Sequence, residues 1–318
     1  MSMRKQTSKT AGAAKQKLPL VIVGSIGVDD IATPFERRTS LLGGSVSYAC
    51  AAAAFFSPVG MVGIVGTDFP AKYLEAYRRM GIDLQGLQQA EGRTFRWSGE
   101  YDADMINRRT LLTELNVFET FMPELPEAYR DASFLLLGNI APSLQLHVLK
   151  ECRRPKFVVA DTMDLWIKNT RAALMKVISR VDMLTLNDSE ARLLTGLYSL
   201  RKAASRILEY GPRYVVIKKG EHGALLVSHA GNFLVPAFPL EDVRDPTGAG
   251  DMFAGAFLGA LAKAGTVNRR TVREALLYGS VVASFGVESF SLDRLLVLKR
   301  VEIARRLGEL KAMMRVER

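Results

Sequence analysis

Apolar, strand-length runs separated by helix-length segments recur through the middle of the chain. They are FLLLGNI, KFVVADTMD, MLTLNDSE and YVVIK, between residues 134 and 218. Apolar strands that alternate with helices predict an α/β fold with a mainly parallel sheet covered by helices on both faces. Ligands collect at the carboxyl ends of such strands, so the polar and glycine residues there are candidate site residues. They are Gly24, Asp29, Asn139, Asp161, Asn187, Glu190, Lys218 and Gly220.

The amino-terminal part of the chain continues this pattern. LPLVIVGSIGVDD, which starts at Leu18, predicts a buried strand followed by a glycine-rich turn. Residues 41–67 hold no charged residue, but the break at Ser57-Pro58 indicates a loop, a buried helix and a strand, because a membrane-spanning helix needs about 20 continuous apolar residues. We therefore expect no membrane association. The next segment, AKYLEAYRRMG, predicts a helix that ends at Gly81.

Residues 93–116, RTFRWSGEYDADMINRRTLLTELN, change to a two-residue alternation. Phe95, Trp97 and Tyr101 fall on one face of the predicted strand, and polar residues fall on the other. This alternation predicts a small antiparallel β lid, inserted in a domain of residues 18–318. The aromatic side chains either pack the lid on the body or cover a ligand, and the pattern favours both interpretations equally.

Composition and charge narrow the class of protein. The 318 residues are 48% hydrophobic, enough for a large core, and the net charge is +10. Half of this excess lies in residues 1–17, a basic, apolar-poor stretch that we expect to be a disordered tail. The remainder is spread over faces of mixed sign, which argues against nucleic-acid binding. Cys50 and Cys152 lack metal-binding spacing and predict buried thiols in a cytoplasmic protein.

The clearest chemical pattern is RDPTGAGDMFAGAFLGAL at residues 244–261. A glycine-rich turn that opens an apolar helix presents unpaired amides and the positive end of the helix dipole, which suits a phosphate group. Asp251 would repel a phosphate held there. It can instead accept the proton of a hydroxyl group that attacks the phosphate, while the amides neutralise the moving charge. The pattern therefore predicts phosphoryl transfer to a hydroxyl group, with Asp251 as general base.

The motif NDSE at residues 187–190 has a structural and a functional interpretation. An Asn followed three residues later by Glu is a helix capping box. The same residues suit a nucleotide site, in which Glu190 organises Mg²⁺ through water and Asn187 reaches a phosphate.

Two glycine-rich segments are equally ambiguous. KKGEHG, at residues 218–223, fits a tight hairpin, or a turn at which Gly220 and Gly223 let a nucleotide approach the backbone. Its His222 is expected to be solvated. Asp29, in VIVGSIGVDD, either caps a loop or accepts hydrogen bonds from the vicinal hydroxyl groups of a sugar.

In chain order, GSIGVD, LGGSVSYACAAAA, VGIVGTD, the lid, NDSE, KKGEHGA and DPTGAGD resemble the PfkB/ribokinase family of carbohydrate and nucleoside kinases. The resemblance implies a ribokinase-like domain with a small β lid, Mg-ATP as phosphate donor, and a primary hydroxyl group of a sugar or sugar-like molecule as acceptor. It also implies individual roles. The base would be Asp251, and the anion hole would be formed by the amides of Gly248, Ala249 and Gly250. ATP and Mg²⁺ would be bound by Asn187, Glu190, Lys218, Gly220 and Gly223, and the acceptor by Asp29, Gly43, Gly44, Ser45 and Tyr48. A monovalent cation such as K⁺ would be bound with the help of Asp245 and Thr247.

The acceptor is where the chain departs from the family pattern. Ribokinase-like sequences often read GGKGAN, and this chain reads GGSVSY, so Ser45 and Tyr48 replace the Lys and Asn that fix ribose. Tyr48 and the lid aromatics either stack a nucleobase, which favours a nucleoside, or pack in the fold. The lid edges predict a homodimer. A catalytically silent ligand-binding protein on the same fold is the alternative of another class, and the intact Asp251 favours the kinase.

Overall fold

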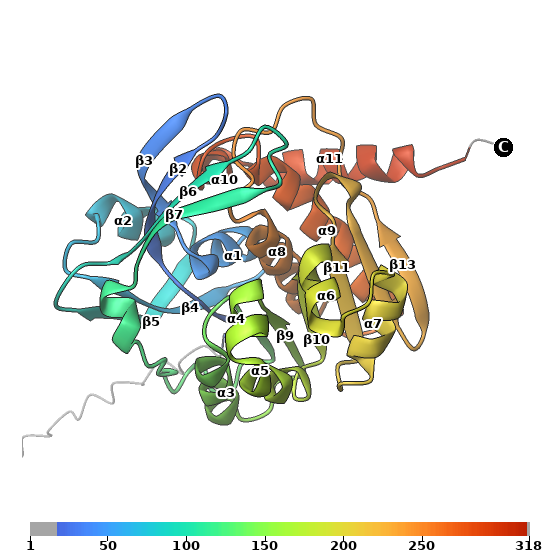
Figure 1. Cartoon of the computed structure of the whole chain (residues 1–318), viewed down its shortest axis with the longest axis horizontal. Helices are drawn as coiled ribbons and strands as arrows, with labels where there is room; N and C mark the ends of the chain where they lie inside the picture. The colour runs from blue at the N-terminus through green and yellow to red at the C-terminus, as the bar shows by residue number, and fades with distance from the viewer. Residues whose placement is uncertain (1–17, 317–318) are drawn as a thin grey trace, which may run out of the picture.

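A large sheet of nine strands forms the centre of the protein, in the order β13-β12-β11-β10-β9-β8-β1-β4-β5 (Figure 1). The computed structural model describes residues 18–316. Neighbouring strands from β11 to β5 run parallel, and β12 and β13 extend one edge as antiparallel hairpins. The predicted parallel sheet is confirmed. The strands are β1 (Leu20–Val23), β4 (Val59–Gly66), β5 (Ile82–Ala90), β8 (Phe134–Leu137), β9 (Phe157–Asp161), β10 (Met183–Asn187), β11 (Tyr214–Lys218), β12 (Ala224–Ser228) and β13 (Gly231–Val235).

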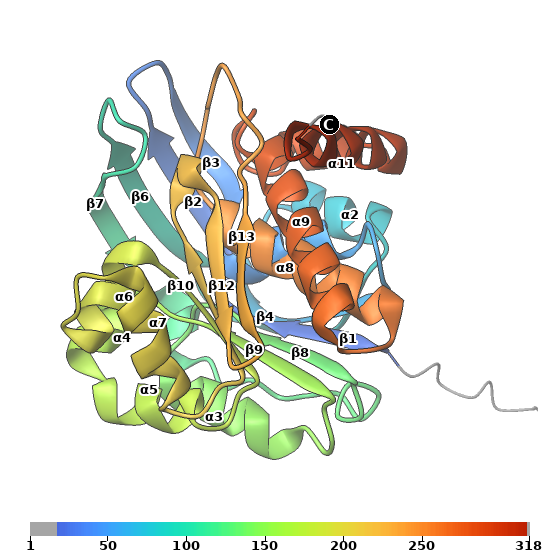
Figure 2. The same ribbon diagram turned by 90° about the vertical axis from the view of Figure 1, so that its right-hand side faces the viewer.

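Helices cover both faces of this sheet (Figure 2). Strands β1, β4, β8 and β9 are buried along their whole length, which is why they read as continuous apolar runs without alternation. Their side chains divide between two hydrophobic clusters, one on each face. The first face carries α1 (Ser45–Ala53), α2 (Ala71–Arg79), α8 (Ala249–Ala264), α9 (Arg269–Gly286), α10 (Asp293–Val297) and α11 (Arg300–Met313); the second carries α3 (Pro142–Glu151), α4 (Asp164–Asn169), α5 (Arg171–Ile178), α6 (Asp188–Thr195) and α7 (Leu200–Leu208).

A second sheet of four strands, in the order β3-β2-β6-β7, forms the lid beside the main sheet. The alternation in residues 93–116 predicted two of its strands, β6 (Phe95–Tyr101) and β7 (Arg108–Glu114). The other two, β2 (Gly27–Ala32) and β3 (Arg37–Gly43), lie where the sequence predicted a turn and a loop. The adjacent carboxylates of VDDI conceal the strand pattern, because Asp29 is buried where an apolar residue is expected.

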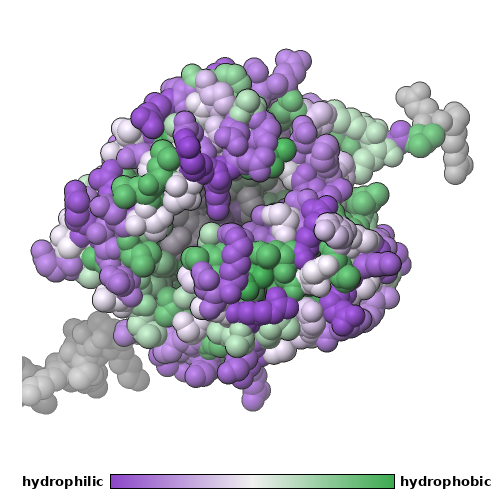
Figure 3. Space-filling view, viewed as in Figure 1, coloured by the Kyte–Doolittle hydropathy of each residue, from purple (hydrophilic) through white to green (hydrophobic). Residues whose placement is uncertain are grey.

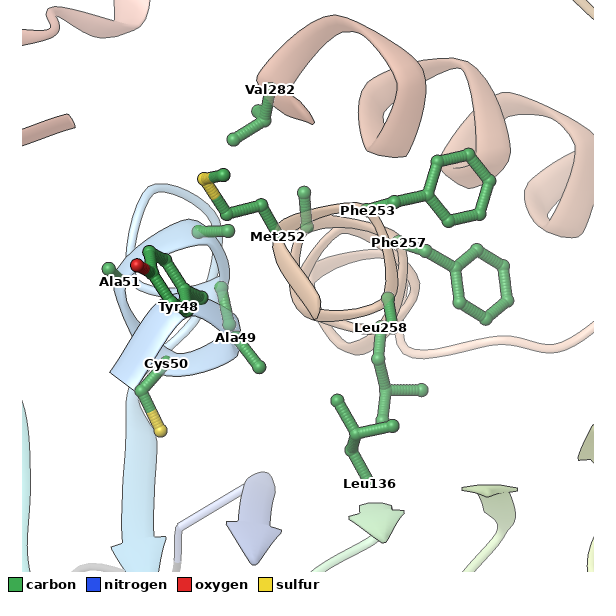
Figure 4. Close-up of a cluster of buried hydrophobic side chains, with 14 of the residues drawn as sticks. Tyr48, Ala49, Cys50, Ala51, Leu136, Met252, Phe253, Phe257, Leu258 and Val282 are labelled. Carbon is green, nitrogen blue, oxygen red and sulfur yellow. The ribbon is translucent and has the colours of Figure 1, made fainter. Parts of the chain in front are cut away.

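Two helices rich in small residues, α1 and α8, pack side by side (Figure 4). A methyl carbon added to Gly255 of α8 would lie 2.0 Å from the carbonyl oxygen of Ala49 in α1, and one added to Gly259 would lie 2.8 Å from that of Ala53. Glycine is therefore required where the two backbones meet. This packing gives the predicted buried helix of residues 41–67 its place in the core.

Three further predictions concern the cysteines, membrane association and the amino-terminal segment. Cys50 and Cys152 are free and buried, as expected. Within residues 18–316, none of the helices combines the length and the apolar character that a membrane crossing requires. The basic segment of residues 1–17 lies outside the described residues.

Candidate active site

The predicted site residues converge at the carboxyl ends of the central strands, where α1 and α8 begin and the lid sheet passes over them. Figure 3 shows this face hollowed near its middle, over the region in which Figure 1 draws α1 and α8. The carboxyl edge of a parallel sheet is the expected position of a ligand. The site has one end at the start of α8 and another at the lid strand β2.

The turn before α8 has the geometry of an anion cradle. Gly248 is the N-cap residue of α8, with φ of 76°. A methyl carbon there would lie 2.4 Å from the ring of Tyr48, so both the positive φ and the lack of space require glycine. The amide of Ala249 already donates to the carbonyl oxygen of Pro246 at 3.2 Å. Within the described chain, the amides of Gly248 and Gly250 have no hydrogen-bond partner. Two of the three predicted cradle amides are thus free of a partner in the described chain, and the role of the three amides toward a phosphate stays a prediction.

Asp251 stands on the first turn of α8, directly after these amides, and is half-buried. Burial raises the pKa of its carboxyl group to about 7; the negative charge of Asp161 adds to this, and the positive charge of Lys218 opposes it. A carboxylate with a pKa near neutrality can accept a proton at physiological pH and release it again. The position and the pKa of Asp251 therefore both suit the predicted general base.

Lys218, the last residue of β11, lies next to the cradle. Its ammonium group is 3.1 Å from Oδ1 of Asp161, the last residue of β9. A methyl carbon added to Gly250 would be 2.8 Å from Nζ of Lys218. Burial alone would lower the pKa of this lysine, but Asp161, Glu190 and Asp251 raise it above its ordinary value. Sequence reasoning had placed Lys218 at the nucleotide and had named Asp161 as a candidate site residue at a strand end, without a specific role.

Asn187 and Glu190 form the capping box of α6. The Asn187 side chain accepts from the amide of Glu190 at 2.8 Å, and the Glu190 carboxylate accepts from the amide of Asn187 at 2.7 Å. The structural interpretation of NDSE is therefore confirmed. Burial raises the pKa of Glu190 to about 7 although Lys218 lowers it, so this carboxylate lies at the same end of the site as Lys218. Its role toward Mg²⁺ stays a prediction.

The turn of residues 218–223 joins β11 to β12 as an antiparallel hairpin, with a short 3-10 helix at Gly220–His222. Both glycines have positive φ, 56° at Gly220 and 75° at Gly223. Gly223 packs against the backbone, because a methyl carbon there would lie 2.0 Å from the carbonyl oxygen of Val235. At Gly220 the same carbon would meet no atom of residues 18–316 within 4 Å, which leaves room at this turn. His222 is solvated, as expected.

Asp29, on β2, forms the other end of the site. Its side chain is 4% exposed, and Oδ1 has no hydrogen-bond partner in the described part of the protein. Burial raises the pKa of Asp29 to about 8, and the charges of Asp245 and Asp30 add to the rise. A methyl carbon at Gly43 would lie 1.9 Å from Oδ2 of Asp29, so the glycine makes room for the carboxylate. A buried carboxylate with an unsatisfied oxygen is suited to a ligand that donates hydrogen bonds.

The other residues predicted to bind the acceptor serve the fold in different ways. Gly44, the N-cap residue of α1, has φ of 92° and no room for a methyl group. The hydroxyl group of Ser45 accepts from the amide of Ser25 at 3.1 Å and so fixes the turn after β1. Tyr48 is 1% exposed and its ring lies against Gly248, which excludes the proposed stacking on a nucleobase. Its hydroxyl group, however, is buried without a hydrogen-bond partner among the described residues.

Asp245 and Thr247, the predicted cation ligands, stand just before the cradle. The Asp245 carboxylate is 1% exposed and accepts from the amides of Thr247, at 2.9 Å, and Ser291, at 3.2 Å. The hydroxyl group of Thr247 donates to that of Tyr101, in the lid, at 3.1 Å. The bond between Thr247 and Tyr101 joins the lid to the turn that precedes α8, and the cation site stays a prediction.

The lid aromatics pack within the fold. Phe95 lies 5.6 Å from the ring of Phe118, and the Trp97 ring covers Gly99, where an added methyl carbon would be 2.1 Å away. Tyr101 is buried in a cluster at the lid base. Of the two interpretations of the alternating face, the structure supports packing.

Sequence reasoning missed Arg108, the first residue of β7. Burial raises the pKa values of Asp29, Glu190 and Asp251, and the positive charge of Arg108 lowers all three. This lid arginine therefore lies within electrostatic reach of both ends of the site. Nothing in the sequence distinguished it from the adjacent Arg109, because only the lid's placement over the body brings it near the carboxylates.

The chain is similar to known kinases in sequence. The profile of pfkB family carbohydrate kinases matches residues 28–296. A cytidine kinase of Thermococcus kodakarensis is 33% identical over 255 residues, which cover 77% of this chain and 89% of the relative.

Solved structures with the same fold include two whose ligands are known. A nucleoside kinase of Burkholderia thailandensis in complex with inosine has a TM-score of 0.76 at 20% identity, and covers 92% of this chain and 99% of its own. A ribokinase of Arabidopsis thaliana complexed with ribose and ATP has a TM-score of 0.74 at 22% identity, with the same coverage. These likenesses confirm the predicted ribokinase-like fold.

Proposed function

This chain belongs to the pfkB family of carbohydrate kinases, and we propose that within this family it transfers the γ-phosphoryl group of Mg-ATP to a primary hydroxyl group of a nucleoside. Phosphorylation of a hydroxyl group on a sugar or nucleoside is the activity of the family. The observation that carries the proposal is the position of Asp251, on the first turn of α8 directly after two amides that have no hydrogen-bond partner among the described residues. This arrangement gives a base for the hydroxyl group and a cradle for the phosphoryl group.

The reaction takes place at the α8 end of the site, where Asp251 and the cradle amides lie next to each other. A carboxylate oxygen of Asp251 accepts the proton of the acceptor hydroxyl group as its oxygen forms a bond to the γ-phosphorus. The bond between the γ-phosphorus and the oxygen that bridges to the β-phosphate breaks, and ADP leaves with that electron pair. The amides of Gly248 and Gly250 donate hydrogen bonds to the oxygens of the transferred phosphoryl group and so stabilise the negative charge on these oxygens during the transfer.

A divalent cation fits this site only with ligands from the nucleotide and from water. Within residues 18–316, no three His, Cys, Asp or Glu side chains converge to hold a metal ion. Mg²⁺ commonly keeps several waters and is bound by one or two carboxylates together with phosphates. Glu190, a buried carboxylate near Lys218, would hold the hydrated ion. When bound, Mg²⁺ supplies positive charge to the β- and γ-phosphates.

The acceptor end supports a molecule with vicinal hydroxyl groups. Asp29 presents an unpartnered oxygen in a buried position, and two hydroxyl groups of a ribose ring can donate to one carboxylate. Ser45 is engaged with the turn after β1, and Tyr48 occupies the other position that distinguishes the chain from ribokinase-like sequences. The likeness to a cytidine kinase favours a nucleoside over a free sugar.

Two further properties extend the proposal. Asp245 and Thr247 would help to hold K⁺, and replacing K⁺ by the large cation N-methylglucamine in the assay would then lower turnover.

The described chain has two free, buried cysteines, consistent with the cytoplasmic location that we propose.

We also propose that two copies associate through the lid. Strands β3 and β7 are the edges of the lid sheet, and the residues of β7 from Arg108 to Thr113 are exposed. Leu111 and Leu112 expose 45% and 46% of their surface. Exposed edge strands favour pairing with another copy. Light scattering should give twice the chain mass, and Leu112→Lys should shift the protein toward the monomer; a monomer at all concentrations would refute the proposal.

The direct test of the function is ADP release from Mg-ATP across a panel of nucleosides, free pentoses, hexoses and polyols, with Asp251→Asn as the blank. We expect turnover that depends on a nucleoside. Turnover confined to free sugars would transfer the proposal to a sugar kinase. Tight binding of ATP and of one acceptor without turnover would indicate the silent ligand-binding protein.

A further inference from the structure

Lys218 differs from the surface lysine Lys168 in two ways: its side chain is largely buried, and it forms an ion pair with a buried carboxylate. Its side chain is 18% exposed, and that of its partner Asp161 is 9% exposed. The pair formed by Lys168 and Asp164 in α4 has a shorter separation, 2.7 Å, but its side chains are 56% and 50% exposed. A lysine is rarely placed in a buried position unless it is paired, because its desolvation is costly. The buried pair therefore calls for an explanation that the surface pair does not.

Asp161 is itself fixed from the other side. Its Oδ1 accepts a hydrogen bond from the hydroxyl group of Thr185 at 2.8 Å, as well as the contact from Lys218. Thr185 is fully buried in β10, so the carboxylate is anchored to the sheet. A fixed carboxylate restricts the four-carbon side chain of the lysine to one region of the site.

The ammonium group lies against the turn that holds the phosphoryl group. Only 2.8 Å separates Nζ of Lys218 from the position of a methyl carbon on Gly250, one of the two cradle residues with an unpaired amide. An ammonium group has three donors, and one of them meets Asp161. The remaining donors of Lys218 and the amide of Gly250 are thus close enough to share an anionic ligand.

We propose that Lys218 is a catalytic residue that binds an oxygen of the transferred phosphoryl group beside the Gly250 amide, and that Asp161 is the positioning residue that holds it there. This inference rests on the proposed kinase function and deepens it. Lys218 keeps its proton throughout, because the proton of the acceptor goes to Asp251. Its fixed positive charge stabilises the charge that spreads over the phosphoryl oxygens as the bond to the leaving ADP breaks.

The proposal is tested by the binding of two nucleotides, which does not depend on turnover. Lys218→Met should weaken Mg-ATP about 10- to 100-fold, the usual range for one hydrogen bond to a charged group, because the γ-phosphate loses its partner. Binding of Mg-ADP, which lacks that group, should change less than about threefold by the same reasoning. Calorimetry of both nucleotides with the parent and Lys168→Met proteins gives the control, since Lys168 carries the same charge in an exposed pair.

Each outcome of this experiment decides between the proposals. Equal loss of ATP and ADP affinity, or no loss, would overturn the role of Lys218 and leave the kinase proposal standing. A parent protein that binds neither nucleotide would overturn the kinase proposal itself. The variant Lys218→Met/Asp161→Asn removes both charges, so it gives the same comparison if Lys218→Met alone leaves Asp161 uncompensated and unfolds the protein.

The positioning role of Asp161 requires its own variant. Asp161→Asn keeps an oxygen that can accept from Lys218, so the preference for ATP over ADP should persist while kcat falls about 3- to 30-fold, less than in Lys218→Met. Small alkylammonium ions should restore part of the activity of Lys218→Ala, and this rescue is not expected of a lysine that only supports the fold. Loss of the ATP preference in Asp161→Asn with normal thermal stability would refute a merely positioning role.

Discussion

The two ends of the site hold carboxylates in opposite settings. At the phosphate end, Asp251 and Asp161 share the positive charge of Lys218 and the amides of the turn. At the acceptor end, Asp29 has an unpartnered oxygen and lies near two further acids, Asp245 and Asp30. The first end is prepared for an anion, because its cationic and amide groups are already in place. The second is prepared for neutral donors, since only hydrogen-bond donors can satisfy it.

The largest effect should come from the phosphate end. Asp251→Asn removes the base but keeps the shape of the side chain, so kcat should fall about 10²- to 10⁴-fold, the range of general base catalysis. Binding of Mg-ATP should be retained, since the carboxylate repels the phosphate and its loss removes that repulsion. Steady-state kinetics together with calorimetry measure both quantities.

The matched control for this variant is Asp164→Asn, which removes a carboxylate from the first turn of α4. That side chain is 50% exposed and should be neutral for turnover. Unchanged kcat in Asp251→Asn would mean that Asp251 is not the base. The phosphate end would then have no catalytic carboxylate to distinguish it from the acceptor end.

Asp29→Asn tests the acceptor end. At about pH 9, above the pKa of about 8, Asp29 is ionised; an amide retains one acceptor oxygen but loses this charge, so affinity for the acceptor should fall about 10- to 100-fold, the range for hydrogen bonds to a charged group. The Kd of Mg-ATP should stay within about twofold, because the change lies at the opposite end. An equal loss of affinity for ATP and acceptor would contradict the separation of the two ends.

The same substitution predicts a stability change in the ligand-free protein. Burial raises the pKa of Asp29 to about 8, whereas an unfolded aspartate titrates near 3.9. The folded state therefore keeps a proton that the unfolded chain releases, and the free energy of unfolding falls as the pH rises from about 4 to about 8. Asp29→Asn should remove this loss, raising Tm by roughly 5 °C at pH 8 and hardly at all at pH 4.5.

Thermal scans at both pH values measure this effect, with Asp293→Asn as an exposed control. A gain in Tm that is equal at the two pH values would contradict a proton on Asp29. It would point instead to relief of the neighbouring negative charges.

Glu190→Gln separates capping from metal binding. Glutamine also completes a capping box, so Tm should stay within about 1 °C. If Glu190 holds the hydrated Mg²⁺, the concentration of Mg²⁺ at half-maximal turnover should rise about three- to tenfold, because the second ligand sphere loses its charge. A titration of turnover with Mg²⁺ at fixed ATP measures this. An unchanged requirement would leave NDSE with the structural role alone.

The phosphate end was more accessible to sequence reasoning than the acceptor end. Asp251 and its glycine turn form one contiguous stretch, so local chemistry alone predicted both the base and the cradle. The hydrogen bond that the amide of Ala249 donates to the carbonyl oxygen of Pro246 was not indicated by this stretch. The pairing of Lys218 with Asp161 joins residues 57 positions apart, at the ends of β11 and β9 on either side of β10, and no local pattern in the sequence indicates such a contact.

The acceptor end depends on tertiary packing, which is why its residues were assigned less well. Asp29 lies on a lid strand whose alternation two adjacent aspartates conceal. Tyr48 suggested a platform for a nucleobase, but its ring fills the space beside Gly248. The GGSVSY segment predicted the start of a helix. Only the fold shows that the ring of Tyr48 packs against Gly248, while its hydroxyl group stays available to a ligand.

Tyr48 gives the smallest effect and the finest test of this difference. Its hydroxyl group is buried without a partner in the described structure, whereas that of Tyr77, also fully buried, is 2.7 Å from the hydroxyl group of Ser47. An unsatisfied hydroxyl group costs about 1–3 kcal/mol, and a satisfied one contributes about 1 kcal/mol. In the absence of ligand, Tyr48→Phe should therefore stabilise the protein and Tyr77→Phe should destabilise it, as denaturant unfolding will measure.

If the acceptor is the missing partner of Tyr48, Tyr48→Phe should also weaken acceptor binding about two- to tenfold, while Tyr77→Phe should not. Destabilisation by both variants would mean that the hydroxyl group of Tyr48 is satisfied without a ligand, and the acceptor end would then rest on Asp29 alone.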